Sequence, residues 1–195
     1  FGEAVKAVDR AIAVYPDRLD FRFLKTNAYV SYEGESPDMA LANLIGLASD
    51  YVNGAEAWTY QGNPVEEGFF EYAMQEYCAS FHTLGTPSSY EAFRKLSEVM
   101  AGYYPDNMDY VVNIGSYHMS AKKDYKTALK YYSKALKKDS DNYLAIRNAC
   151  IAARRIGNVK MEKKYLTMLA EHGDEKQMQQ AIDGALRGTF RPEFL

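Results

Sequence analysis

Apolar residues recur every three or four positions along most of this 195-residue chain, and this helical period constrains the fold more than any other feature. One such stripe ends at Pro16 and consists of Ala4, Val8, Ala11 and Val14. Proline and glycine interrupt the pattern at short intervals, so the predicted helices are short. Short helices joined by a few residues fold back on their neighbours as antiparallel hairpins. The sequence therefore predicts an all-α fold.

Helix-start signals locate several of these helices. Ser36 precedes Pro37, which suits a first helical position because proline lacks the N–H that would be unpaired there. Ser88 followed by Glu91 fits a capping box. A carboxylate at a helix start can also accept unpaired backbone N–H groups. Three further helices are predicted to start in this way, at Asp106, Asp124 and Asp141.

These signals divide the chain into consecutive parts of one predicted domain, residues 1–195. The expected parts are a leading helix (1–16), four hairpins (19–52, 65–104, 106–140 and 141–173), an ordered insertion (53–64) and a capping helix (174–188). Counted without Tyr and with Gly, the apolar share is about 45%, and the charged share is 25%, as in globular domains. The chain can therefore bury a core.

A shift of the sequence by 34 residues aligns large residues with large ones and small with small. Val112 falls on Ile146, and Ser116 falls on Cys150. One predicted hairpin cannot bury the apolar faces of both its helices, so repeated hairpins stack and share a core. The sequence thus predicts an α-solenoid of antiparallel helix hairpins.

This period and two-helix unit resemble the tetratricopeptide repeat. The family's second-helix signature is matched by Ala4, Val8, Ala11 and Pro16, and it recurs in weaker form as Ala40, Leu44 and Leu47, as Ala92, Leu96 and Val99, and as Ala128, Tyr132 and Ala135. The first-helix signature is poorer, and Gly115 lies one position from its usual place. The resemblance implies a right-handed superhelix. A generic helical-repeat solenoid is the alternative.

In that family the first helix of each hairpin lines a concave groove that binds proteins or peptides. Carrying the groove positions over nominates Arg22, Lys25, Tyr29, Tyr32, Tyr77, Phe81, Asn113, Tyr117, Arg147, Ile151 and Arg154. Tyr and Arg are enriched at interface hot spots, so we expect a non-enzymatic binding scaffold whose ligand is acidic or carries a free carboxylate. An aromatic stripe at helical spacing also fits a core. Some family members clamp a chaperone's C-terminal carboxylate, but Tyr29 stands where that clamp has Asn.

Charge is unevenly distributed along the chain. Between Thr26 and Phe93 there are ten acidic residues and no Lys or Arg, whereas Lys122 to Lys164 contains thirteen basic residues and four acidic ones. The row Lys126, Lys130, Lys134 and Lys137 also fits an ordinary solvated helix face. An acidic and a basic half favour, as an alternative function, a self-assembling homo-oligomer.

Enzyme signatures such as phosphate loops, HExxH and GxSxG do not occur in the sequence. An enzyme alternative is a helical hydrolase with a Cys78/His82 dyad, because residues four apart share a helix face. The spacing of Cys78 and Cys150 indicates neither a disulfide framework nor a zinc site. We therefore expect no catalytic residue, cofactor or metal.

The remaining classes are limited by charge and hydropathy. A net charge of −3 argues against a nucleic-acid binder, and no apolar run has the length of a membrane span, so we expect a soluble protein. The sequence starts at Phe1, without Met, a charged n-region or an apolar h-region, so we expect that any targeting peptide was removed or never existed. Abundant Tyr and Asn with this start favour a processed bacterial cell-envelope (periplasmic) protein over a cytoplasmic one.

Overall fold

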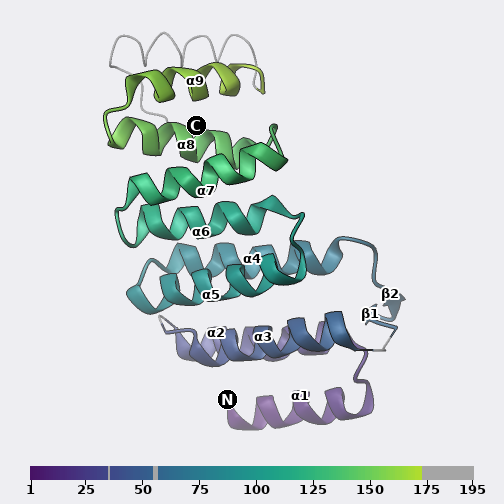
Figure 1. Ribbon diagram of the computed structural model, residues 1–195. Coiled ribbons are helices and arrows are strands. Elements are labelled where there is room, and N and C mark those ends of the chain that lie inside the picture. The colour runs from purple at the N-terminus through teal and green to yellow at the C-terminus, as the bar shows by residue number, and fades with distance from the viewer. Residues whose placement is uncertain (35, 55–56, 173–195) are drawn as a thin grey trace. The chain divides into compact units, whose positions relative to one another are not determined.

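A computed structural model describes residues 1–34, 36–54 and 57–172. Within these residues there are nine helices and one two-stranded sheet, and the helices pack against other helices of the same unit, so the prediction of an all-α fold is confirmed (Figure 1). The chain divides into two compact units, Phe1–Tyr103 and a second that begins at Tyr104. The expected capping helix over 174–188 lies outside the described residues.

The first unit is built from five helices and a small hairpin of strands. In order, these are α1 (Gly2–Val14), α2 (Leu19–Glu33), α3 (Asp38–Asn53), β1 (Thr59–Tyr60), β2 (Asn63–Pro64), α4 (Phe69–Leu84) and α5 (Pro87–Tyr103). Helix α1 packs on α2, α2 on α3, and both α3 and α4 pack on α5. Side chains such as Leu44, Met74 and Leu96 are fully buried in this unit. Leu44 and Leu96 belong to predicted stripes and lie in the core, whereas the predicted stripe of α1 supplies no buried residue and its Val14 is 66% exposed.

The second unit contains four helices packed in sequence order. They are α6 (Met108–Ser120), α7 (Tyr125–Lys138), α8 (Tyr143–Arg155) and α9 (Val159–Ala170). Each packs on the next, and α6 also contacts α8. Ile146 and Tyr132 are completely buried in the core that these helices share. Helices α6 and α7 approach closely at Gly115, where an added Cβ atom would lie 2.7 Å from Cε1 of Tyr132.

The interrupted passage before α4 contains strands, which the helical period did not predict. β1 and β2 pair antiparallel, and Gln61 and Gly62 form the turn with φ of 50° and 82°. The Thr59 amide donates to the Asp17 carbonyl oxygen at 2.9 Å, so the hairpin is attached to the turn between α1 and α2. Nearby, the Trp58 ring lies 5.5 Å from the Tyr51 ring of α3.

The predicted start of the third helix is corrected. Helix α3 begins at Asp38, and the Glu33 carboxylate, rather than Ser36, accepts from the amides of Met39 and Ala40, at 2.6 and 2.9 Å. Glu33 can cap α3 because the end of α2 lies beside the start of α3. A local sequence pattern does not reveal this proximity.

The capping box of α5 is formed by Thr86 and Ser89 instead of Ser88 and Glu91. The Ser89 amide donates to Thr86 Oγ1 at 3.2 Å, and the Thr86 amide donates to Ser89 Oγ at 3.0 Å. Helix α5 starts at Pro87, two residues earlier than a cap at Ser88 requires.

Of the three acidic helix starts, only Asp124 is the cap, and its side chain accepts from the Thr127 amide. Asn107 and Asn142, each one residue after the expected Asp, cap α6 and α8.

Candidate partner-binding surfaces

A hollow of about 370 Å³ lies on the first unit beside α2, β1 and α4. We call it the aromatic hollow, because Phe23, Tyr60, Phe69, Tyr72 and Tyr77 supply much of its lining. Asn27, Ala73, Glu76 and Ser80 complete it. Its volume falls within the range of small-ligand and peptide side-chain pockets.

Two of the lining rings are fixed by contacts within the unit. The Tyr77 hydroxyl donates to Asn27 Oδ1 at 2.8 Å and lies 3.4 Å from the Phe23 carbonyl oxygen, which links α4 to α2. Burial raises the pKa of the Tyr77 hydroxyl well above its ordinary value, so this group stays a hydrogen-bond donor. The Tyr60 ring packs at 4.8 Å from the Phe69 ring. The hollow is therefore a preformed surface.

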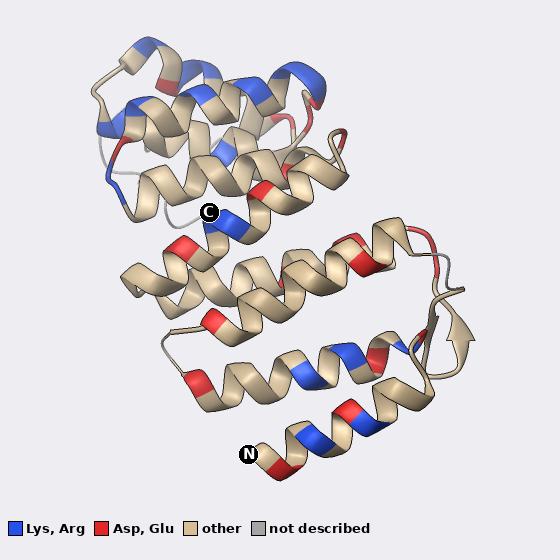
Figure 2. Ribbon diagram, turned by 60° about the horizontal axis from the view of Figure 1, so that its bottom comes forward, with Lys and Arg blue, Asp and Glu red and all other residues tan. Residues whose placement is uncertain are grey.

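The rest of the lining is open to solvent. Tyr72 is 64% exposed, and Glu76 is also exposed. Glu76 is the only charged residue among the described residues of the lining. Neither α3 nor α4 contains Lys or Arg (Figure 2). Because Arg22 and Lys25 of α2 are paired with carboxylates, Glu76 leaves the lining with a negative charge that favours a neutral or basic ligand over an acidic one.

The groove residues predicted on α2 are held by contacts within the first unit. Arg22 forms an ion pair with Asp50 at 3.2 Å, and Lys25 forms one with Asp9 at 2.7 Å. The Tyr32 ring stacks on the Phe1 ring at 3.8 Å, and the Tyr29 ring lies 6.0 Å from the same ring. The charges of Arg22 and Lys25 are therefore already neutralised by carboxylates of the chain.

On α4, the structure separates the two predicted groove residues. Tyr77 lines the aromatic hollow, whereas Phe81 is completely buried in the core. The alternative interpretation of an aromatic stripe as core thus holds for Phe81, because it faces the interior of the unit.

The residues predicted on α6 and α8 belong to the second unit. Asn113, Tyr117 and Ile151 are buried, with 8%, 4% and 7% exposure. The Arg147 guanidinium donates to Asn148 Oδ1 at 3.4 Å, and Arg154 forms an ion pair with Glu162 of α9 at 3.7 Å. Most of these side chains pack within the unit, and the two arginines are only partly exposed.

Sequence reasoning missed Tyr60, Phe69, Tyr72 and Glu76 of the aromatic hollow. Tyr60 lies on a strand that the helical period did not predict, and the tertiary fold brings it beside α4. The available signal was the density of aromatic residues around Trp58 and the start of α4. That signal gives no information about which rings face a common space.

The proposed Cys78/His82 dyad lacks an accessible nucleophile. Cys78 is fully buried, and its sulfur accepts a hydrogen bond from the Ser97 hydroxyl at 3.5 Å. The His82 ring packs against the rings of Tyr90 and Phe93, and burial lowers its pKa. Reactive cysteines are at least partly exposed and lie in electropositive surroundings, so this geometry does not favour the hydrolase alternative.

No three His, Cys, Asp or Glu side chains within residues 1–34, 36–54 and 57–172 are grouped as a metal ion would require. None of the helices in the described part of the chain has both the length and the apolar composition needed to cross a membrane. Comparison with protein-family models and with curated proteins finds no match to this chain.

Proposed function

We propose that this protein is a binding module that holds a peptide segment of another protein in the aromatic hollow. The observation that carries the proposal is the preformed set of rings on the first helices of two successive hairpins, α2 and α4, with Tyr72 largely exposed. Large, rigid rings with a polar group supply most of the energy of protein interfaces. Tyr77 fixes one wall of the hollow by its bond to Asn27.

The proposed ligand is a peptide with an aromatic or large apolar side chain next to a Lys or Arg. The apolar side chain would fill the space between the rings, and the cation would face Glu76. The sequence had instead led us to expect an acidic ligand whose carboxylates bind Arg22 and Lys25. These two side chains already form ion pairs with Asp50 and Asp9.

We also propose that the hairpins are of the tetratricopeptide type. Helices α7 and α9 begin one repeat length of 34 residues apart, at Tyr125 and Val159. Both members of the pairs aligned by that shift are buried, as for Val112 and Ile146 and for Tyr132 and Leu166. A solved complex with the peptide lying along α2 and α4 would support both this assignment and the proposed site.

Selection of a random peptide library on the full chain tests the proposal. We expect selected peptides to share an aromatic residue flanked by a basic one. Tyr72→Ala should weaken their binding about tenfold, as is typical of an aromatic hot spot, and Glu76→Lys should abolish the preference for basic residues. Tyr143→Ala is the control, since Tyr143 is an exposed tyrosine that does not line the hollow.

Selected peptides that bind Tyr72→Ala and Glu76→Lys as tightly as the wild type would contradict the proposal. Binding that instead depends on Arg147 and Arg154 would place the ligand on α8, among the groove positions that the family resemblance implied.

A further inference from the structure

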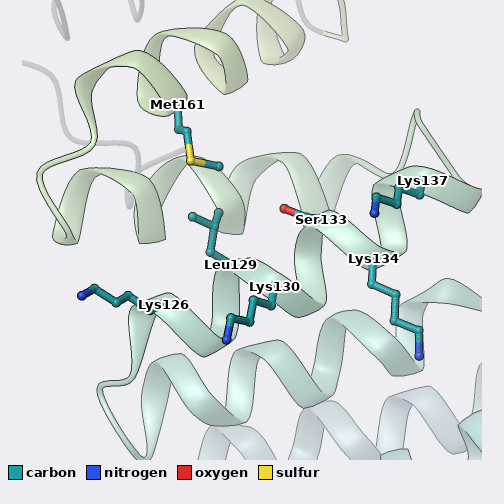
Figure 3. Close-up of a pocket in the computed structure, with 7 residues that line it drawn as sticks. All are labelled: Lys126, Leu129, Lys130, Ser133, Lys134, Lys137 and Met161. Atoms are coloured by element: carbon teal, nitrogen blue, oxygen red, sulfur yellow. The ribbon is translucent and has the colours of Figure 1, made fainter.

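A second hollow, of about 410 Å³, lies on the second unit between α7 and α9. Its apolar part comes from two side chains, Leu129 of α7 and Met161 of α9, which point toward one another (Figure 3). The hydroxyl groups of Ser133 and Tyr165 lie 3.4 Å apart and connect the same two helices. Leu129 is only 7% exposed, so the apolar floor is recessed below the surrounding surface.

Four exposed lysines in a row along α7 also line this hollow, and we call them the lysine rim: Lys126, Lys130, Lys134 and Lys137. Like charges one helical turn apart repel each other. Among the described residues, none of the four forms an ion pair, whereas the neighbouring Lys138 pairs with Asp106 at 3.3 Å. Asp124, the acidic residue nearest in sequence to Lys126, caps α7 by accepting from the Thr127 amide, and its charge also attracts Lys130 without forming an ion pair.

We propose that this hollow and its lysine rim bind an acidic amphipathic helix of a partner protein. Carboxylates placed one turn apart on such a helix match the spacing of Lys126, Lys130 and Lys134, because both helices have the same pitch. A large apolar side chain on the same face of the partner would cover Leu129 and Met161. Binding would replace repulsion along α7 by attraction across the interface.

The lining favours a protein partner over the other polyanions. Among the described residues, it contains no aromatic ring on which a nucleic-acid base could stack and no arginine for bidentate phosphate contacts. A flat lipid surface would leave the recessed Leu129 uncovered, whereas a protruding side chain fills the hollow. The charge of this surface is opposite to that of the aromatic hollow, so the two would select different ligands.

Fluorescence anisotropy of a labelled synthetic peptide with the full chain tests this inference. The probe is a helical peptide of about 15 residues, or four turns, with Glu at every fourth position and Leu on the same face. We expect saturable binding that weakens as salt is raised. Lys130→Glu should weaken it about fivefold to tenfold, because a charge reversal turns an attraction at the rim into a repulsion.

Two control variants distinguish an effect of this site on binding from an effect of the protein's net charge. Lys163→Glu makes the same change of charge at an exposed position of α9 that does not line the hollow, and it should leave the affinity within about twofold. Met161→Gln keeps all charges and should weaken binding of the Leu peptide more than binding of a peptide with Ser in place of Leu.

Absence of binding at low salt would overturn the proposal, as would equal losses for Lys130→Glu and Lys163→Glu. Equal or tighter binding of oligo(dT) or of phosphatidylserine vesicles, with the same dependence on Lys130, would also overturn it by showing a general polyanion surface. Loss of peptide binding in Tyr72→Ala would assign the peptide to the aromatic hollow instead.

Discussion

The close approach of α6 and α7 at Gly115 predicts that Gly115→Ala destabilises the second unit. Alanine normally stabilises a helix interior relative to glycine by about 1 kcal/mol. Here the new Cβ atom would lie 2.7 Å from Tyr132 Cε1 and 3.0 Å from Tyr131 Cβ, whereas carbon atoms in contact are about 3.5–4.0 Å apart. Tyr132 has no exposed surface into which it can move, and its hydroxyl lies 3.3 Å from Ser116 Oγ.

The expected magnitude follows from these opposing effects. Overpacking of a core costs about 1–3 kcal/mol, and the helix-propensity gain offsets about 1 kcal/mol. We therefore expect a net loss of about 1–2 kcal/mol in the free energy of unfolding of the second unit. For a unit of this size, each kcal/mol lowers the melting temperature by about 4–8 °C.

Gly46→Ala supplies a matched control of opposite sign. Gly46 lies inside α3, and an added Cβ atom meets nothing within 4 Å, so we expect a gain of about 1 kcal/mol. Urea denaturation followed by far-ultraviolet circular dichroism measures both variants. If Gly115→Ala proves as stabilising as Gly46→Ala, the steric reasoning about α6 and α7 is wrong.

Three further predictions follow from other contacts. Asn142→Ala removes the cap of α8 together with hydrogen bonds to Asp109 and Asp139 at 2.8 and 3.0 Å. It should lower the free energy of unfolding, measured by urea titration, by about 1–2 kcal/mol. An unchanged urea midpoint would contradict the capping role. Burial lowers the pKa of His82 below its ordinary 6.5, so the unfolded state binds the proton more tightly and stability should fall as the pH drops below 6.5. His82→Gln should reduce that dependence, and an identical pH profile for the variant would refute it. Iodoacetamide should modify neither buried cysteine, Cys78 or Cys150, until urea unfolds the chain, and rapid labelling of native Cys78 would revive the hydrolase alternative.

The helices were predictable from the sequence because their apolar period is local information. The helix starts were less predictable. Asp106 and Asp141 each precede an Asn, and both residue types cap helices well. Only the backbone geometry selects Asn107 and Asn142. Glu33 illustrates a stronger limit, because its role depends on the end of α2 meeting the start of α3.

The candidate site was predictable only in part. The groove positions implied by the resemblance include Tyr77, which lines the aromatic hollow. The same positions could not reveal that Asp9 and Asp50 would neutralise Lys25 and Arg22, since those pairs join different helices. They also could not separate Phe81, which is core, from Tyr77, because both lie on one helix face four residues apart.

The position of Trp58 gives the protein an intrinsic spectroscopic label. It is the only tryptophan of the chain, it belongs to the first unit, and its buried indole Nε1 has no hydrogen-bond partner among the described residues. Its emission should therefore lie toward the blue in the native protein and shift to the red when that unit unfolds. Because helical ellipticity reports both units together, a difference between the two signals would reveal whether the halves of the chain melt independently.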